Sequence, residues 1–281
     1  MISVVIPSYR ARDLCIRAVK SALDQTFADL EVIVVEDGSH ALGREDLPPD
    51  PRVRFFQLQE NMGGARARNF GVQNAQGNLI AFLDADDWWT PTKLEEQLRI
   101  IRTIPPSEKD WLIYNQVNFS SKWFPIRPID ETDDLTTFLI YERNYIQTSG
   151  FLMPRRTALR FPFDESLRRH QDFDLLIDLR SASVPFIMCD AKTVFYGEDD
   201  GRWRVGSVKE IQATLHWISK RQEEISRAAL ADLYAFHLGR ALITSHPFVA
   251  ANYLLLAVRI FPPIFIRLVQ RTVAKTISRQ T

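Results

Sequence analysis

The stretch Leu79-Ile80-Ala81-Phe82-Leu83-Asp84-Ala85-Asp86-Asp87 places an apolar run directly before three carboxylates. A short continuous apolar run is typical of a strand buried on both faces of a parallel sheet. Three similar runs precede it, at residues 2–6, 30–35 and 53–58, and segments with helical spacing lie between them. Strands that alternate with helices indicate a parallel sheet with right-handed crossovers.

Acidic residues at the ends of these strands predict where a ligand binds. Asp37 follows the second strand and the Asp84–Asp87 segment follows the fourth. Ligands of such sheets bind beyond the carboxyl ends of the strands. Asp84 and Asp86 can converge, because alternate residues of an extended segment project to one side. Their oxygens suit Mg²⁺ or Mn²⁺; a solvated loop that caps the next helix is the alternative.

The overall composition is that of a globular chain. Of 281 residues, 46% are hydrophobic and 25% are charged, which excludes a disordered, collagen-like or many-span membrane protein. Cys15 and Cys189 are too few for a disulfide framework and are expected in the core. The first residues do not resemble a signal peptide, so a cytoplasmic setting is expected.

Charge is distributed unevenly although the formal total is 35 − 35 = 0. The last 49 residues hold six cations and no Asp or Glu, so they carry +6 and the first 232 residues carry −6. Arg259, Pro262 and Pro263 interrupt the apolar stretch 248–266, which makes it a poor membrane span. Beyond it, a cationic stripe adjoins an apolar one at helical spacing (Arg267, Arg271, Lys275 and Arg279; Ile266, Val269, Val273 and Ile277).

This tail predicts a helix that lies in an anionic membrane surface. The alternative is a helix packed on the catalytic domain or on a second copy of the chain, so a homodimer stays open.

Several familiar sites are excluded. The first turn, Pro7-Ser8-Tyr9-Arg10, has no glycine, so neither GxGxxG nor GxxxxGK is present. The chain has no GxSxG, and its five histidines lack zinc-ligand spacing. A nucleotidyltransferase normally needs a glycine- and lysine-rich first turn, which this segment does not provide. A dehydrogenase and a standard NTPase are disfavoured, and no feature points to nucleic acid.

Two further segments carry candidate chemistry. Residues 61–69 combine Gly63-Gly64, a helix start and two arginines, a combination that favours phosphate or carboxylate. A helix start packed by small residues explains them equally well. Asp172 could serve as a general base beside a substrate hydroxyl; a simple N-cap is the alternative.

Taken in order, these segments resemble the inverting nucleotide-sugar glycosyltransferases of family 2, which have the GT-A fold. The resemblance covers about residues 2–205 and weakens over residues 109–144. The matching segments are residues 4–9, 33–39, 61–71, 82–87, 149–151 and 163–167 together with Asp172.

The resemblance implies an α/β fold: a Rossmann-like mixed sheet, mostly parallel and flanked by helices, with a C-terminal helical extension. The GT-A catalytic domain would span residues 1–206, with a donor half at about 1–108 and an acceptor half at about 109–206. Residues 207–281 would form the helical extension, whose basic amphipathic end associates with a membrane.

The resemblance also implies roles for single residues. Donor nucleotide contacts fall to Pro7, Tyr9, Arg10, Asp37, Arg68, Asp84 and Asp86. Asp84 and Asp86 would hold Mn²⁺ or Mg²⁺ with the diphosphate, and Asp172 would be the catalytic base. Where the family usually has Glu-Asp, this chain has Gln171-Asp172, which implies a changed acceptor contact. A basic segment with Arg202, Trp203 and Arg204 would close over the donor.

The function implied is the transfer of a sugar, with inversion, from a nucleoside diphosphate sugar to a hydroxyl of a glycan or lipid-linked acceptor. A UDP-sugar is the favoured donor, surface polysaccharide biosynthesis is the favoured process, and the inner face of the cell membrane is the expected place. The alternatives are a nucleotidyltransferase and a catalytically degenerate module that binds a nucleotide or glycan.

Overall fold

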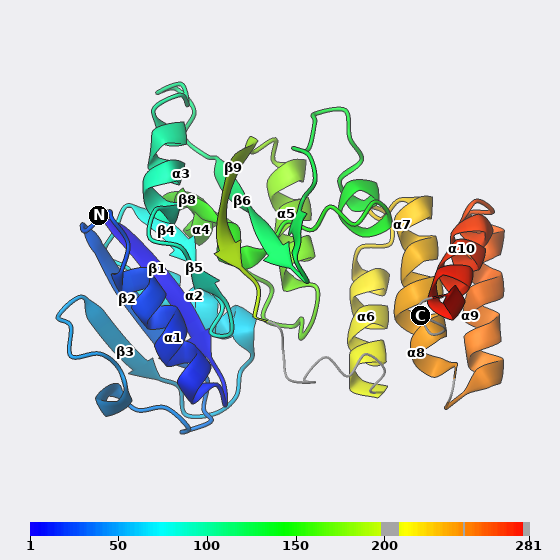
Figure 1. Cartoon of the computed structure of the whole chain (residues 1–281), viewed down its shortest axis with the longest axis horizontal. Helices are drawn as coiled ribbons and strands as arrows, with labels where there is room; N and C mark the ends of the chain where they lie inside the picture. Colours follow the sequence, from blue (N-terminus) through cyan, green and yellow to red (C-terminus); the bar gives the residue numbers. More distant parts are fainter. Residues whose placement is uncertain (198–207, 244, 278–281) are drawn as a thin grey trace. The chain divides into compact units, whose positions relative to one another are not determined.

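The computed structural model describes residues 1–197, 208–243 and 245–277. These residues form two compact units (Figure 1). The first contains residues 1–131 and 144–197, and the second contains residues 132–143 and the described chain from Val208 onward. The sequence had placed residues 132–143 in the acceptor half. They cluster with the C-terminal helices because Thr136 and Thr137 bond Ser226, at 2.9 and 2.7 Å.

A mixed sheet forms the centre of the first unit. Its order across the described residues is β3-β2-β1-β4-β8-β6-β9-β5, and β7 pairs with β6 at one side. The strands are β1 (Ile2–Ser8), β2 (Leu30–Glu36), β3 (Val53–Gln57), β4 (Leu79–Phe82), β5 (Trp88–Trp89), β6 (Leu112–Phe119), β7 (Lys122–Phe124), β8 (Leu152–Pro154) and β9 (Phe186–Phe195).

The four predicted strands form the parallel half of this sheet. β1 lies between β2 and β4, with Val5 opposite Ile33 and Phe82, and β3 pairs with β2. β8 runs antiparallel to both β4 and β6, which joins the halves of the sheet. The β-branched residues of β1 and β2 are buried, as expected for strands covered on both faces. The expected mixed α/β architecture is therefore confirmed.

Helices and short turns connect the strands. They are α1 (Arg12–Leu23), η1 (Arg44–Asp46), α2 (Gly64–Asn74), α3 (Lys93–Ile101), η3 (Thr148–Gly150), α4 (Arg155–Arg160) and α5 (Gln171–Ser181). The core includes both cysteines as free, buried thiols, as expected. α2 packs so closely on β1 that a Cβ at Gly71 would collide with the Val5 side chain, so glycine is required at this contact.

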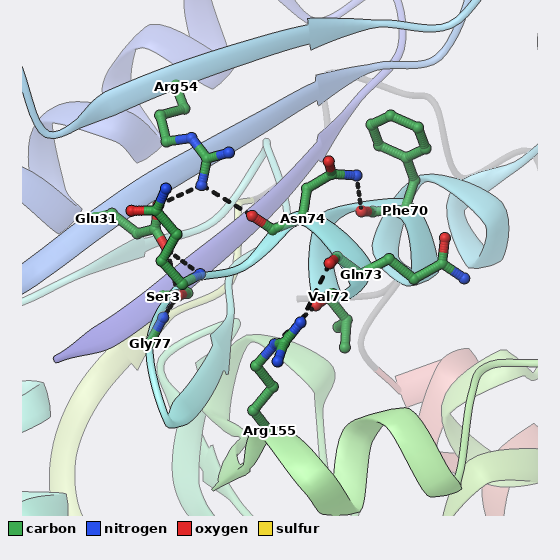
Figure 2. Close-up of polar contacts among 10 residues, drawn as sticks. Ser3, Glu31, Arg54, Phe70, Val72, Gln73, Asn74, Gly77 and Arg155 are labelled. Carbon is green, nitrogen blue, oxygen red and sulfur yellow. Dashed lines mark hydrogen bonds and ion pairs between the residues drawn. The ribbon is translucent and has the colours of Figure 1, made fainter.

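A buried carboxylate anchors the starts of the strands. It lies at the edge of the sheet opposite residues 84–87, which we call the carboxylate loop. Glu31 accepts hydrogen bonds from the Ser3 hydroxyl (2.6 Å), Arg54 (2.7 Å) and the Gln76 N–H (2.6 Å) (Figure 2). Burial alone would raise the pKa of Glu31, but these three donors together lower it. This end of the sheet is therefore fixed by charge as well as by packing.

The carboxyl end of α2 lies at the same anchor. Arg54 donates to the Asn74 carbonyl at 2.8 Å, and Arg155 donates to the carbonyls of Val72 and Gln73 at 3.3 and 3.2 Å (Figure 2). Cations stabilise the negative end of a helix dipole. The positive end of α2, at Gly63 and Gly64, is consequently directed toward the carboxyl ends of the strands.

The second unit is helical. It contains η2 (Thr137–Tyr141), α6 (Val208–Lys220), α7 (Arg227–Asp232), η4 (Leu233–Gly239), α8 (Arg240–Leu242), α9 (Pro247–Ile260) and α10 (Ile264–Ile277). A small apolar core holds α7, η4, α9 and α10 together; its buried members are Ala231, Ala235, Phe236, Ala257 and Ile264. No helix among the described residues has the length and apolar character required to cross a bilayer.

A buried ion cluster in this unit corrects one sequence expectation. Asp232 is fully buried and pairs with Arg143 at 3.0 Å and Arg267 at 3.5 Å. Arg267 also donates to the Tyr141 carbonyl and lies 4.1 Å from the centre of the Tyr141 ring. Arg267 was expected in a cationic stripe facing lipid. It turns inward because Asp232 and Tyr141 offer it a buried anion, a carbonyl and a ring.

Candidate functional site

The carboxylate loop begins where β4 ends. The Leu83 N–H donates to the Val5 carbonyl at 3.1 Å, and the Asp87 N–H closes a turn on the Asp84 carbonyl at 3.1 Å. Asp84 and Asp86 are partly exposed, whereas Asp87 is 1% exposed. The loop therefore exposes two carboxylates in part and buries the third.

Asp87 acts as an internal clamp. Its carboxylate accepts hydrogen bonds from the Ser149 hydroxyl and from the Gly197 N–H, the latter at 2.9 Å. Burial raises the pKa of Asp87 well above its usual value, and the charges of Asp86 and Asp84 raise it further. The Ser149 hydroxyl oxygen in turn accepts a hydrogen bond from the Asp84 N–H at 3.0 Å. Asp87 thus joins three segments that are distant in the sequence.

Arg17 of α1 also supports this loop. Its guanidinium donates to the Asp86 carbonyl and lies 4.2 Å from the centre of the Trp88 ring. Gly197 packs so tightly on the Asp86 carbonyl that a side chain there would collide with it. Neither Arg17, Ser149 nor Gly197 was singled out in the sequence as a support for this loop, because no local motif marks a residue that acts through tertiary contact.

The donor set of the loop suits a divalent cation shared with a ligand. The described residues contain no group of three or more His, Cys, Asp or Glu placed to hold a metal. Asp84 uses Oδ1 to pair with Arg68, and its Oδ2 has no hydrogen bond to any described residue. Mg²⁺ and similar hard cations are usually held by one or two carboxylates plus substrate phosphates. Asp84 and Asp86 fit that pattern, and Asp87 does not belong to it.

Arg68 of α2 contacts both a residue predicted at the donor site, Asp84, and a residue predicted at the acceptor site, Gln171. Its guanidinium donates to Asp84 at 2.5 Å and to the Gln171 side-chain oxygen at 2.9 Å. The residue is 9% exposed, and its guanidinium carbon lies 5.2 Å from the centre of the Phe163 ring. A planar fork can hold two acceptors at fixed positions. Segments around residues 84 and 171 therefore meet at one edge of the sheet.

Asp172 lies in the first turn of α5. His170 is the N-cap residue of this helix and has a left-handed backbone conformation, with φ of 61°. The helix therefore begins at Gln171. Burial raises the pKa of Asp172 above its usual value, although the Phe173 N–H and the charge of Arg68 oppose this effect. A carboxylate whose pKa is raised is a better proton acceptor. Gln171 is fixed beside it, since its amide also donates to the Leu167 carbonyl at 2.6 Å.

Asp37 holds the loop that precedes α2. Its two oxygens accept hydrogen bonds from the N–H groups of Met62 and Gly63, both at 2.8 Å, and the residue is 2% exposed. Gly63 has φ of +97°, a conformation that other residues rarely adopt, and a Cβ there would lie 2.8 Å from Arg168. Asp37 therefore fixes the loop that starts α2, whatever contact it makes with a ligand.

The end of β1 presents the other predicted nucleotide contacts. Pro7 is the penultimate residue of the strand, and Tyr9 is 42% exposed directly after it. The Arg10 guanidinium lies 5.3 Å from the Tyr9 ring, and the Arg10 N–H donates to the Ser39 hydroxyl at 3.0 Å. An exposed aromatic ring beside a cation suits stacking with a planar base.

Glu36, at the end of β2, holds the loops after β1 and β2 in place. The sequence analysis did not predict this role. It is fully buried and accepts hydrogen bonds from the hydroxyls of Ser8, at 2.7 Å, and Ser39. The two loops that follow β1 and β2 are thereby joined.

Three predicted contacts cannot be placed at this site. Arg202, Trp203 and Arg204 lie outside the described residues.

Sequence comparison assigns a family to this architecture. Residues 3–168 match the family model described as glycosyl transferase family 2. One curated relative is the amylovoran biosynthesis glycosyltransferase AmsB of Erwinia amylovora. It is 28% identical over 246 residues, which are 83% of this chain and 81% of that protein.

Solved structures share the fold at low sequence identity. S. aureus TarS 1-349 in complex with UDP-GlcNAc is 16% identical with a TM-score of 0.61, over 92% of this chain and 79% of that one. The mannosyltransferase PcManGT from Pyrobaculum calidifontis, in complex with GDP-Man and Mn²⁺, is also 16% identical with a TM-score of 0.61. That match covers 97% of this chain and 80% of the other. The expected GT-A fold is thereby confirmed.

Proposed function

The chain belongs to glycosyl transferase family 2 and is a glycosyltransferase, and we propose that it moves a sugar from a nucleoside diphosphate sugar to an acceptor hydroxyl with inversion. The observation that supports this most is the double contact of Arg68, which holds Asp84 and Gln171 at one site. Donor binding and acceptor activation need such proximity, because the attacking oxygen must approach the anomeric carbon.

The reaction is a single displacement in which Asp172 is the base. Asp172 takes the proton of the acceptor hydroxyl while that oxygen forms a bond to the anomeric carbon. The bond from that carbon to the diphosphate breaks, and the nucleoside diphosphate leaves on the opposite face. The raised pKa of Asp172 favours this role, since proton uptake becomes easier as the pKa approaches the working pH.

In this proposal the donor binds at the carboxyl ends of β1, β2 and β4. Tyr9 offers a stacking face to the base, while Pro7, Arg10 and Asp37 border the nucleotide. Asp84 and Asp86 would hold Mn²⁺ or Mg²⁺, which when bound neutralises the charge that develops on the diphosphate. Arg68 keeps Asp84 in position and adds positive charge beside it.

We propose a UDP-sugar as the donor to test first. The bound donors named for the two fold relatives, UDP-GlcNAc and GDP-Man, make a GDP-sugar the second. The name of AmsB, an amylovoran biosynthesis glycosyltransferase, supports a role in polysaccharide biosynthesis. We further propose that the acceptor is a glycan or a lipid-linked glycan at the cytoplasmic membrane face.

This function is tested with a panel of UDP- and GDP-sugars in the presence of Mn²⁺. Two quantities are measured for each donor, the melting temperature of the protein and the release of the nucleoside diphosphate. One donor should raise the melting temperature and be turned over, and turnover should cease in EDTA. A ligand that binds without any turnover, with acceptor glycans present, would favour a degenerate binding module.

A further inference from the structure

One face of α9 exposes large apolar side chains. Phe248 and Leu255, two helical turns apart, are 87% and 69% exposed, and the exposed Asn252 and Arg259 lie about one turn before and after Leu255. Residues spaced by three, four and seven positions share a face of a helix. The opposite face packs in the core of the second unit through Leu254, Ala257 and Val258. The exposed residues therefore form one stripe rather than isolated points.

α10 presents a second apolar stripe. Phe265, Ile266 and Val269 are 58%, 61% and 46% exposed. Ile264 and Leu268 pack inward in the core that α10 shares with α9, and Arg267 turns to Asp232. The two helices follow one another and contact each other in the unit (Figure 1). We use the name outward surface for six exposed apolar residues of these two helices, which are Phe248, Leu255, Leu256, Phe265, Ile266 and Val269.

Charge indicates which partner this surface fits. The chain from Leu233 to Thr281 has six cations and no acidic residue, and Arg259 is exposed on the apolar stripe of α9. One of the six, Arg267, is paired with Asp232, which leaves a charge of +5 when Asp232 is included. Two copies of such a segment would repel one another, because both are cationic. An apolar surface with the exposed Arg259, in a segment of net positive charge, suits anionic lipid head groups with acyl chains beneath them.

We infer that the outward surface of α9 and α10 binds the head-group region of an anionic bilayer. α9 has 14 residues, so its length of about 21 Å is shorter than the ~30 Å hydrocarbon core, and the helix lies in the interface. This goes beyond sugar transfer and does not depend on it. It also assigns the contact to the apolar faces of two helices, rather than to a stripe that includes Arg267.

Sedimentation of the full chain with vesicles tests the assignment. Phosphatidylcholine vesicles containing phosphatidylglycerol should bind the chain, and pure phosphatidylcholine vesicles should bind it weakly. The double variant Leu255→Asp/Phe265→Asp should lose at least roughly tenfold of this binding, since it places charge on the inserted face. Ile126→Asp is the matched control, because Ile126 of the first unit is 70% exposed and lies outside the surface.

Further measurements separate this inference from its rivals. Melting temperature and donor hydrolysis should be unchanged in the double variant, which would show that folding and the transfer site are intact. Equal vesicle binding by the double variant and the unsubstituted chain would overturn the inference. So would a dimer, detected by light scattering, that the double variant dissociates while vesicle binding stays absent. That result would assign the surface to a second copy.

Discussion

Arg68 donates a 2.9 Å hydrogen bond to Gln171, a residue 103 positions later in the chain. The same guanidinium holds Asp84, so one side chain of α2 spans the carboxylate loop and the start of α5. The predicted donor residue Asp84 and the predicted acceptor residue Gln171 are thus held next to the same side chain.

Substitution of Arg68 by Gln should change the pH dependence of transfer. The positive charge of Arg68 lowers the pKa of Asp172, whereas the charge of Asp84 raises it. Without Arg68 the pKa of Asp172 rises, and the base is protonated up to a higher pH. The acidic limb of kcat/KM should therefore move to higher pH, with a loss of roughly tenfold to a hundredfold above it. Arg68→Lys retains the charge and should leave the limb nearer its original position; an unmoved limb in Arg68→Gln would contradict this coupling.

Asp87 and Asp86 should differ in what their removal costs. Asp87→Ala leaves the Ser149 hydroxyl and the Gly197 N–H without their acceptor, so the free energy of unfolding should fall by about 1–3 kcal/mol. Asp86→Ala should keep most of the stability and lose the Mn²⁺-dependent part of nucleotide binding. Urea unfolding and titration calorimetry measure the two effects. Equal stability losses in both variants would refute the division of roles.

Glu31 should stabilise the first unit in a pH-dependent way. Its folded-state pKa is lowered, so its contribution is complete above the unfolded pKa of about 4.3 and is lost as the pH falls through the folded value. Glu31→Gln should lose about 1–3 kcal/mol at neutral pH. The difference from the unsubstituted chain should shrink on acidification below about pH 4. A difference that stays constant across this range would argue against an ionised Glu31.

Asp232 should dominate the stability of the second unit. Asp232→Asn removes the buried anion from the partly buried Arg143 and Arg267, which should cost about 3 kcal/mol. Glu224→Gln is the control, since Glu224 is 41% exposed in its pair with Arg221 and should cost less than about 1 kcal/mol. Hydrogen exchange in α10 should accelerate only in Asp232→Asn. Comparable exchange in both variants would mean that the cluster does not hold α10.

The parallel half of the sheet could be predicted because its strands are continuous apolar runs. Residues 30–35 and 79–83 were expected as strands, and β2 and β4 are observed at Leu30–Glu36 and Leu79–Phe82. Acidic residues at strand ends also carry positional information, since parallel strands end at a common edge. The meeting of Asp84, Arg68 and Gln171 follows from that rule together with the family resemblance.

Other features depend on contacts between distant segments and leave no local pattern. β8 has three residues, and nothing in its sequence indicates that it joins β4 to β6. Asp86 and Asp87 are adjacent and chemically identical, yet only the partners Ser149 and Gly197 turn Asp87 inward. Arg267 shares the spacing of a lipid-facing stripe, but a buried anion 35 residues earlier determines its direction.

Asp172→Asn tests the central claim most directly, with sugar transfer and Mn²⁺-dependent nucleotide affinity measured on the same preparation. Removal of the base should lower kcat by about 10²–10⁴-fold, while nucleotide affinity and melting temperature stay at the level of the unsubstituted chain. Transfer by Asp172→Asn at a rate close to that of the unsubstituted chain would contradict the role of Asp172 and with it the assembled site.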